Sequence, residues 1–598
     1  MSKLSVRAPR AEAVTLCLFE GEIETRVPMT RCDRGEGEGW IAEAPPPGTR
    51  YGLRAHGVWA PEQGLWFDPA KLLVDPRAVE LDRPFAYNPA LSAHGADTAA
   101  LVPRAIMPGA LPDLPRCPPF FRRGGLIYEI NVRGLTMLHP EVPEPQRGTV
   151  AALAHPAVLA HLEKLHVSAV ELMPINAWID ERHLPPLSLR NAWGYNPVVP
   201  MALDPRLCPG GVVELRETVA ALHARGIGVI LDLVFNHTGE SDVLGPIISF
   251  RGLDNAAYAH APDGSLINDT GCGNTLDFAN PAVRSLVLDS LRHFVRHCGV
   301  DGFRFDLAPV MARGPAFASD APIFAEIADD PWLADRVLIA EPWDIGPGGY
   351  QLGQFPANWL EWNDRYRDDV RRFWRGDAAI GVLAQRIAGS SGIFGMDCRS
   401  VNFLAAHDGF TLADTLAYAE RHNHANGEDG RDGHGENFSW NNGVEGPTGD
   451  HAICARRAAL ARAMLGTLFV STGTIQLTAG DEFGRSQRGN NNAYAQDNAV
   501  TWIDWIGRDR ALEDHVAALS TWRAKRDMSQ FSENGTWTAL EGGALDAARW
   551  ENPATPGFVW RSGGEAARPT GLRIDRAAPE AGPLDDEGAG SQSGDMPI

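Results

Sequence analysis

The chain has 598 residues, of which 44% are hydrophobic and 22% charged, so it has enough apolar side chains for at least one large core. With 54 Lys and Arg against 76 Asp and Glu, its formal net charge is −22. A surface this acidic repels phosphate backbones and anionic lipid heads, which argues against nucleic acid and membrane partners and leaves neutral substrates open.

The eight cysteines are spread along the chain, without a CxxC pair or a Cys/His cluster at zinc spacing. This pattern predicts buried thiols in a reducing compartment. The first residues lack the continuous apolar stretch of a secretory signal, and no segment reaches the roughly 18 uncharged apolar residues needed to span a bilayer. We therefore expect a cytoplasmic protein. The sequence gives no indication of its oligomeric state.

Short alternating apolar stretches, separated by Gly- and Pro-rich breaks, run from Leu4 to about Pro103. VTLCLF from Val14 and YGLRAHG from Tyr51 are examples. Such stretches are typical of half-buried strands, and they predict a small β-sandwich over residues 1–115. Residues 107–125 are dense in proline and cannot form a long helix or a central strand, so we expect a domain boundary there.

Between residues 116 and 505, near-continuous apolar runs alternate with longer segments of helical spacing. This alternation predicts a parallel sheet covered by helices. With about eight such runs, closure into a (β/α)8 barrel is the expected fold. The apolar runs that we assign to strands begin at Ile127, Ala169, Val229, Gly302, Val337, Val401 and Thr474.

After the barrel the pattern returns to short strands between Ile506 and Arg561, which predicts a small β domain over residues 506–570. Residues 571–598 are rich in Gly, Pro and acidic residues and have almost no large apolar ones. We expect this tail to be solvated and disordered.

Charged residues stand at the ends of four of the apolar runs. A carboxylate that emerges from a buried strand costs several kcal/mol unless it is paired. An ion pair with a neighbouring Arg would explain one such carboxylate as well as catalysis would, but four strand ends together favour a site, because catalytic groups collect at the carboxyl ends of barrel strands. These residues are Asp232, Arg304, Asp306, Glu341, His407 and Asp408.

Two carboxyl groups on either side of a reacting bond are what glycoside hydrolysis requires. Arg304 precedes Asp306 by two residues, so both side chains face the same way on a strand, and the guanidinium would hold Asp306 ionised. Apolar neighbours would raise the pKa of Glu341 and suit it to donate a proton. From the residues alone, Asp408 could equally take the role of Asp306 or that of Glu341.

The segments VILDLVFNHTGE, GVDGFRFDLA, VLIAEPWD and VNFLAAHDGF resemble, in order, the four conserved blocks of the α-amylase superfamily of retaining glycoside hydrolases. The resemblance implies Asp306 as nucleophile, Glu341 as general acid/base and Asp408 as the carboxylate that stabilises the transition state. It also implies sugar contacts in the cleavage subsite. Apart from the resemblance, the flat apolar ring of Trp193 makes it a weaker candidate for a sugar contact. The implied substrate-binding residues are Arg304, His237, His407 and the stacking platform Tyr195, with Asp232 and Asn236 as structural members of the first block.

Further stretches narrow the resemblance to bacterial glycogen debranching enzymes of the isoamylase type, from about Arg7 to Trp505. They are TGCGNTLDFANP from Thr270, the loop RHNHANGEDGRDGHGENFSWNNGVEG and AGDEFGRSQRGNNNAYAQDN. The resemblance implies hydrolysis of α-1,6-glucosidic branch linkages in glycogen or limit dextrin by double displacement. In some amylases the residue that matches Asn236 binds calcium, but nothing else in the sequence marks an oxygen cage, so we expect no metal and no cofactor. Retention predicts about 5–5.5 Å between the carboxyl groups of Asp306 and Glu341.

Relative to that family, the chain begins almost inside the first expected strand and is shorter after Trp505, which could affect stability or chain-length preference. No catalytic position is substituted, so we expect an active enzyme. The alternatives are an α-1,4-acting amylase or 4-α-glucanotransferase of the same superfamily, and a non-catalytic glycan-binding protein.

Two segments rich in Gly and Asn have two interpretations each. Residues 422–450 are either an ordinary mobile loop or a wall of the cleft that accepts the branch. GNNNAY at residues 489–494 either hydrogen-bonds sugar or serves as turn scaffolding.

Overall fold

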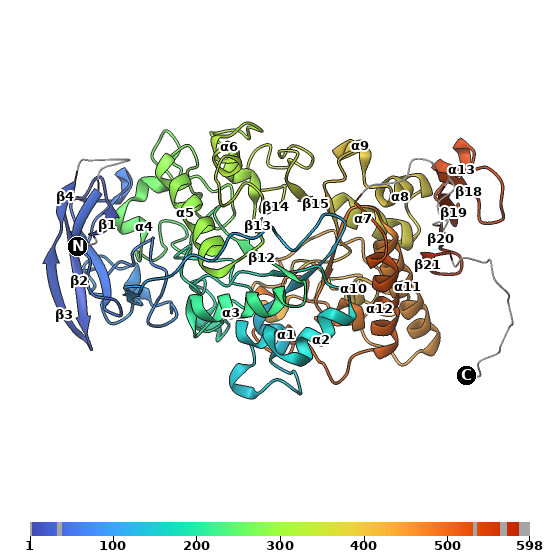
Figure 1. Cartoon of the computed structure of the whole chain (residues 1–598), viewed down its shortest axis with the longest axis horizontal. Coiled ribbons are helices and arrows are strands. Elements are labelled where there is room, and N and C mark those ends of the chain that lie inside the picture. The colour runs from blue at the N-terminus through green and yellow to red at the C-terminus, as the bar shows by residue number, and fades with distance from the viewer. Residues whose placement is uncertain (1–2, 33–38, 530–534, 563–570, 585–598) are drawn as a thin grey trace.

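The computed structural model describes residues 3–32, 39–529, 535–562 and 571–584. Figure 1 shows three parts that follow one another along the long axis of the molecule: sheets near the N-terminus, a central barrel, and a sheet near the C-terminus. This order agrees with the predicted fold class, a (β/α)8 barrel with a β domain on each side.

The N-terminal part is a sandwich of two antiparallel sheets with the strand orders β3-β2-β6-β9 and β1-β5-β4. Apolar residues at every second position, such as Val14 and Leu16, pack with Trp40 of the other sheet in one core. Its strands are β1 (Lys3–Arg7), β2 (Ala13–Glu20), β3 (Ile23–Pro28), β4 (Thr30–Cys32), β5 (Gly39–Glu43), β6 (Arg50–His56) and β9 (Ala105–Ile106), beside the small ribbon of β7 (Trp59–Ala60) and β8 (Leu65–Trp66).

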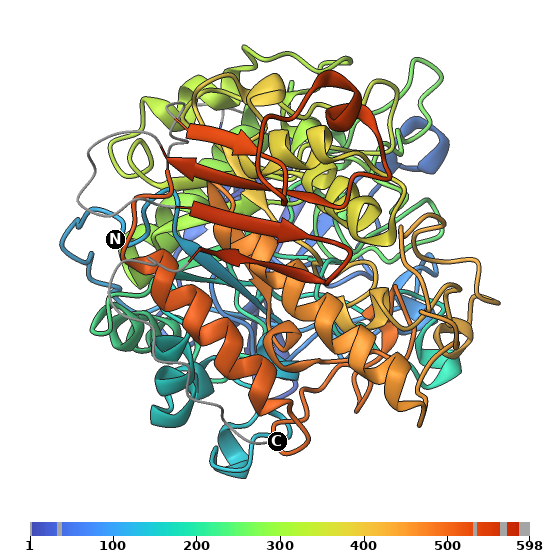
Figure 2. The same ribbon diagram turned by 90° about the vertical axis from the view of Figure 1, so that its right-hand side faces the viewer.

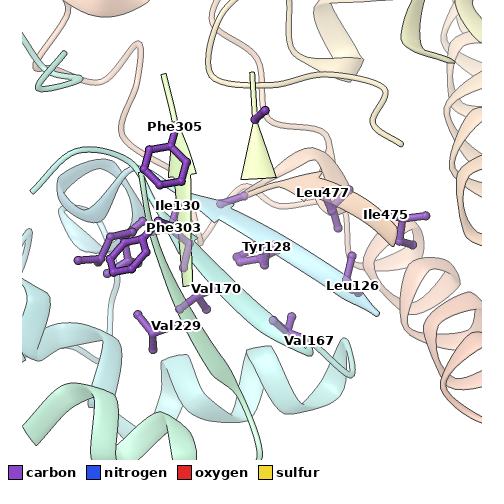
Figure 3. Packing of buried hydrophobic residues seen from close by; sticks show 14 of the residues in the cluster. Leu126, Tyr128, Ile130, Val167, Val170, Val229, Phe303, Phe305, Ile475 and Leu477 are labelled. Atoms are coloured by element: carbon purple, nitrogen blue, oxygen red, sulfur yellow. The ribbon is translucent and has the colours of Figure 1, made fainter. Parts of the chain in front are cut away.

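Eight parallel strands close into the barrel in chain order. Successive side chains point alternately outward and inward. Figure 3 shows residues of the outward layer, among them Tyr128, Val170 and Phe303, on neighbouring strands. Ile127 and Ile230 belong to a separate inner cluster. The strands are β10 (Leu126–Ile130), β11 (Ala169–Leu172), β12 (Gly228–Leu233), β13 (Gly302–Phe305), β14 (Val337–Ala340), β15 (Leu360–Trp362), β16 (Ser400–Asn402) and β17 (Thr474–Thr478).

Seven of these strands coincide with apolar runs in the sequence, and β15 does not. It has only three residues, and Glu361 stands in its centre, so it lacks the run of apolar residues by which the others are recognised. The helices of the chain are α1 (Val132–Thr136), α2 (Pro156–Lys164), α3 (Gly211–His223), α4 (Phe250–Leu253), α5 (Pro281–Cys298), α6 (Pro322–Ala328), α7 (Asp364–Arg375), α8 (Ile380–Ile387), α9 (Ser391–Phe394), α10 (Leu412–Thr415), α11 (His451–Val470), α12 (Arg510–Ala524) and α13 (Ala547–Glu551).

The start of the predicted C-terminal β domain at residue 506 is wrong, because residues 510–524 form the helix α12. The side chain of Asp509 caps this helix, and Leu512, Val516 and Leu519 form a buried stripe at helical spacing. This stripe belongs to the barrel's hydrophobic core, and α12 packs against α11. The chain therefore leaves the barrel after α12.

The predicted disordered tail is also wrong at its beginning. The C-terminal sheet has the order β18 (Gly535–Thr538), β19 (Gly557–Ser562), β20 (Gly571–Asp575) and β21 (Glu580–Pro583). Its last two strands lie within residues 571–598. Leu572 and Ile574 are buried at alternate positions, and this short pattern is hidden by the polar composition around it. Figure 2 shows the sheet in front of the barrel helices, and β21 contacts α11. Residues 585–598 lie outside the described part of the chain.

Gly466 lies where α11 meets β21. A Cβ atom on this residue would stand 1.8 Å from the carbonyl oxygen of Ala581. We expect Gly466→Ala to lower the free energy of unfolding by about 1–3 kcal/mol, because the sheet must move away from the helix. Gly392→Ala in α9 is the control, since its Cβ would meet no atom within 4 Å. Equal midpoints of urea unfolding for both variants would contradict this close contact.

The eight cysteines all lie in the described part of the chain, and none forms a disulfide. The prediction of buried thiols holds for four of them, whereas Cys117 and Cys454 are exposed. Across the described residues, the structure contains no helix that is both long and apolar enough to cross a membrane. The buried cysteines are Cys17, Cys208, Cys298 and Cys398.

Candidate active site

The charged residues predicted at strand ends gather at the carboxyl end of the barrel. Asp232 is the fifth residue of β12, Arg304 the third of β13, and Asp306 follows β13 directly. Glu341 follows β14 directly, and Asp408 comes six residues after the end of β16. Because the strands are parallel, their carboxyl ends open to the same side of the barrel.

One inward layer of the barrel is polar. Glu129 of β10 stands beside Glu171 of β11, and Asp232 of β12 beside Arg304 of β13. All four side chains are buried. On β10, β11 and β12 the inward residue two positions earlier is apolar and belongs to the inner cluster. The inside of the barrel therefore changes from apolar to charged along the strands, and the charged level supports the site.

The guanidinium of Arg304 joins three carboxylates. Nη1 donates to Asp232 at 2.8 Å and to Asp306 at 3.1 Å, and Nη2 lies 3.1 Å from Glu341 Oε2. Arg304 is fully buried, and its ring neighbour is Trp362, 4.3 Å from the guanidinium carbon. One buried cation thus holds the two predicted reacting carboxyl groups on its two terminal nitrogens.

Asp306 accepts further hydrogen bonds from Asn236. The Asn236 amide donates to the Asp306 carboxylate at 2.7 Å and to the Asp306 carbonyl oxygen at 2.8 Å. Asn236 in turn hydrogen-bonds His237, whose other ring nitrogen lies 2.9 Å from the carbonyl oxygen of Tyr195. Donors from β13 and from the segment after β12 therefore fix the orientation of Asp306.

Glu341 is the carboxyl group best suited to hold a proton. Burial, opposed by Arg304 and reinforced by the charge of Asp306, raises the pKa of Glu341 to about 8. Its Oε2 accepts the backbone N–H of Leu307 at 2.7 Å. Leu307 has a φ of +41°, an uncommon conformation for a residue with a branched side chain, and this turn aims its N–H at the carboxyl group.

A second chain of contacts links Tyr195 to the barrel. Its hydroxyl donates to Asp232 and lies 3.2 Å from Nδ1 of His407, and its ring stacks on the His407 ring with centroids 4.7 Å apart. Burial, opposed by Arg304, raises the pKa of Asp232 to about 6. Although burial disfavours the charged imidazole, the hydrogen bond to Glu129 at 2.8 Å raises the pKa of His407 to about 9.

Asp408 receives a hydrogen bond from a residue that the sequence analysis did not single out. Nε2 of His434 donates to Asp408 Oδ2 at 2.8 Å. Burial works against ionisation of Asp408, but this hydrogen bond and the charges of His434, His407 and Arg367 hold its pKa far below the usual range. Asp408 is therefore ionised throughout the neutral range.

The structure connects eight of the nine predicted site residues directly, and it places the ninth, Asp408, next to His407 in the chain. Trp193 stands with its ring edge-on to His407 at 5.0 Å. Sequence reasoning missed Glu129, Trp362 and His434. Glu129 carried the same signal as Asp232, a charge within an apolar strand. Trp362 lies on the unrecognised β15, and His434 lies in a loop without regular pattern.

Asparagine side chains tie residues 421–446 to residues 489–492. Asn423 and Asn491 hydrogen-bond each other at 2.8 Å, and the Asn490 amide donates to Asn426 at 2.8 Å. These four side chains are buried. Of the two interpretations of GNNNAY, turn scaffolding agrees with these contacts. Through His434 the loop 421–446 forms one side of the site at Asp408.

This chain is similar to known proteins in sequence and in fold. Residues 2–78 match the family model for carbohydrate-binding module 48, described as the isoamylase N-terminal domain. A glycogen debranching enzyme of Serratia proteamaculans is 47% identical over 92% of this chain and 86% of its own length. Another, from Klebsiella pneumoniae, is 44% identical over 91% of this chain and 86% of its own length.

Solved structures of pullulanases share the fold. The pullulanase from Bacillus acidopullulyticus has a TM-score of 0.70 at 21% identity, over 96% of this chain and 68% of that one. The pullulanase from Anoxybacillus sp. LM18-11, complexed with maltotetraose, has a TM-score of 0.70 at 22% identity, over 96% and 80%. This chain is 44–47% identical to these two glycogen debranching enzymes over 86% of their length. It therefore belongs to the family of bacterial glycogen debranching enzymes, glycoside hydrolases of the α-amylase superfamily that cleave α-1,6-glucosidic linkages.

Proposed function

We propose that this chain hydrolyses α-1,6-glucosidic branch linkages of glycogen or limit dextrin with retention of configuration. Asp306 is the nucleophile, Glu341 the general acid/base, and Asp408 the carboxylate that stabilises the transition state. The observation that carries the proposal is the buried guanidinium of Arg304, which contacts both Asp306 and Glu341 while their surroundings differ. Two carboxyl groups in different environments are the requirement for acid/base and nucleophilic roles in one site.

In the first step Glu341 protonates the O6 atom of the branch-point glucose while Asp306 attacks the anomeric carbon. The C–O bond to the branch point breaks, and an ester bond to Asp306 forms. Hydrogen bonds from Arg304 and Asn236 fix the orientation of the Asp306 carboxylate. The raised pKa of Glu341 keeps its proton available near neutral pH.

In the second step a water molecule replaces Asp306 at the anomeric carbon. Esterification removes the negative charge of Asp306, which is one of the charges that raise the pKa of Glu341. Glu341 therefore ionises more readily at this stage and accepts the proton of the attacking water. Two inversions at the same carbon restore its configuration. A separation of about 5–5.5 Å between the two carboxyl groups remains a prediction of this mechanism.

The sugar in the cleavage subsite would lie against Tyr195, with His237 and His407 as hydrogen-bonding partners. The hydroxyl of Tyr195 is held by Asp232, so its ring has a fixed orientation. Asp232 contacts Arg304 on its other oxygen and acts by positioning these two groups. Trp193, beside the His407 ring, is a further candidate for sugar contact.

Other activities of the superfamily use the same carboxylates and differ in linkage or acceptor. An α-1,4-acting enzyme or a glucanotransferase would share the geometry of Arg304, Asp306 and Glu341, and identity to debranching enzymes favours α-1,6 hydrolysis over both. A non-catalytic glycan-binding protein would have no need for a carboxyl group held protonated beside an ionised one.

The test is the release of reducing ends from phosphorylase-trimmed glycogen, untreated glycogen and linear amylose, with chain lengths of the products and Asp306→Ala as control. We expect short linear chains from the trimmed polymer, and none from the variant. Cleavage of amylose would indicate an α-1,4 enzyme, and products longer than the branches would indicate transfer. No release from any polymer would favour a binding protein.

The proposal includes the cytoplasm as the place of action and a branched α-glucan as partner, with neither nucleic acid nor membrane. The absence of disulfides among the eight cysteines supports a reducing compartment. The net charge of −22 is compatible with an uncharged polysaccharide and unfavourable for nucleic acid.

A further inference from the structure

His434 is a loop residue that reaches one of the three proposed catalytic carboxylates. It lies in the loop 421–446, and Nε2 donates to Asp408 Oδ2 at 2.8 Å. Its side chain remains 48% exposed, so burial of the ring gives little reason for its position. Its hydrogen bonds are made through Nε2 and through the backbone carbonyl oxygen.

The backbone of His434 is held by amides from two segments. The side chains of Asn491 and Asn437 donate to its carbonyl oxygen at 2.9 and 3.1 Å. The carbonyl oxygen of Asn491 also accepts the N–H of Gly409, the residue after Asp408. Asn491 therefore contacts both sides of the pair, and the distance between His434 and Asp408 is set by a shared anchor.

The charges around this pair are mostly positive. Arg367 and Arg371 of α7 face both Asp408 and His434, and His407 adjoins Asp408 in the chain. Arg371 also binds the loop, donating to the carbonyl oxygen of Asn437 at 2.9 Å. In this setting the hydrogen bond to Asp408 raises the pKa of His434 and lowers that of Asp408. Each partner favours the charged form of the other.

We propose that His434 is a positioning residue for the reaction: it fixes the orientation of the Asp408 carboxylate and keeps it ionised, so that the loop 421–446 completes the active centre. This inference rests on the proposed function. Asp408 can stabilise positive charge at the anomeric carbon only when it is ionised and correctly turned, and no other described side chain hydrogen-bonds its carboxylate.

Removing the imidazole should weaken stabilisation of the transition state more than it weakens substrate binding. Without the imidazole, Asp408 can rotate toward the arginines of α7, so kcat should fall by about 10–100-fold, the usual effect of losing a hydrogen bond to a charged group, with a smaller change in KM. The pKa of Asp408 should rise, which moves the acidic limb of the pH–rate profile to higher pH. The charge of Asp408 helps to raise the pKa of Glu341, but Asp408 stays ionised at alkaline pH, so the alkaline limb, which we assign to Glu341, should move less than the acidic limb.

The experiment compares three variants of the full chain on phosphorylase-trimmed glycogen: His434→Ala, His434→Gln and His422→Ala. Glutamine retains an N–H donor but not the charge, so His434→Gln should recover most of kcat while its acidic limb stays raised. His422 is the matched control, because it lies in the same loop, is 46% exposed and hydrogen-bonds a carboxylate, Glu445 at 3.1 Å, away from the catalytic groups. His422→Ala should resemble the unchanged protein.

If the unchanged protein is active and His434→Ala has the same kcat and the same acidic limb, the inference is overturned and the proposed function stays intact. Equal losses in His434→Ala and His422→Ala would also overturn it, because they would indicate a general effect on the loop. If the unchanged protein releases no chains, the proposed function itself fails.

Discussion

Replacing Asp306 by asparagine is expected to lower kcat on trimmed glycogen by at least about 10⁴-fold, the scale of losing a catalytic nucleophile. Asparagine has nearly the same shape but cannot form the glycosyl ester. The fold should survive, because Arg304 keeps its hydrogen bond to Asp232 and asparagine retains the shape of the replaced side chain. The measurement is the rate of reducing-end release, together with thermal unfolding of both proteins.

Asp301→Asn is the matched control for this experiment. Asp301 adjoins the same strand β13 at its amino end, away from the site, and is also buried. Its carboxylate accepts the N–H groups of Phe120 and Val229 at 2.8 and 2.7 Å. We expect this variant to lose stability and to retain turnover where folded. Activity in Asp306→Asn within tenfold of the unchanged protein would exclude Asp306 as the nucleophile.

Replacing Glu341 by glutamine is expected to lower kcat by about 10²–10⁴-fold on glycogen, the range for a general acid/base. The direction in which kcat/KM changes with pH can also be checked. Because the pKa of Glu341 is raised to about 8, its proton is present below that pH and is lost above it. In the unchanged protein kcat/KM should therefore fall as the pH rises through about 8, and this limb should be absent in the variant.

A substrate with an acidic aryl leaving group separates the two roles of Glu341. Its departure needs little protonation, so the variant should form the glycosyl enzyme at a nearly normal rate and then release it slowly for want of a base. A burst of phenol is the expected observation. Glu361→Gln is the control, since Glu361 is another buried glutamate with an arginine partner, Arg399 at 2.7 Å, and burial raises its pKa to about 7. An alkaline limb that persists in Glu341→Gln would assign it to another group.

Much of the barrel could be predicted because its signal is local. Strands buried on both faces read as apolar runs, and a charge within such a run, as at Asp232 or Glu341, is conspicuous. The same reasoning missed strands whose local composition does not match their buried position in the fold. In β15 a glutamate occupies the middle of three residues, and at β20 the alternation of Leu572 and Ile574 is too short to stand out.

The sequence by itself predicted the barrel, its flanking β domains and a group of charged residues at strand ends, because spacing and burial along a strand are properties of neighbouring residues. The roles of Asp306, Glu341 and Asp408 among them came from the resemblance to the α-amylase superfamily. The tertiary structure alone decided which distant charges act on Glu341 and which loop reaches the site. Glu341 owes its raised pKa to burial and to Asp306, which stands 35 positions earlier in the chain. His434 meets Asp408 through a loop whose anchor, Asn491, comes from beyond the last barrel strand. Such contacts depend on how distant segments are folded together, and no local pattern encodes them.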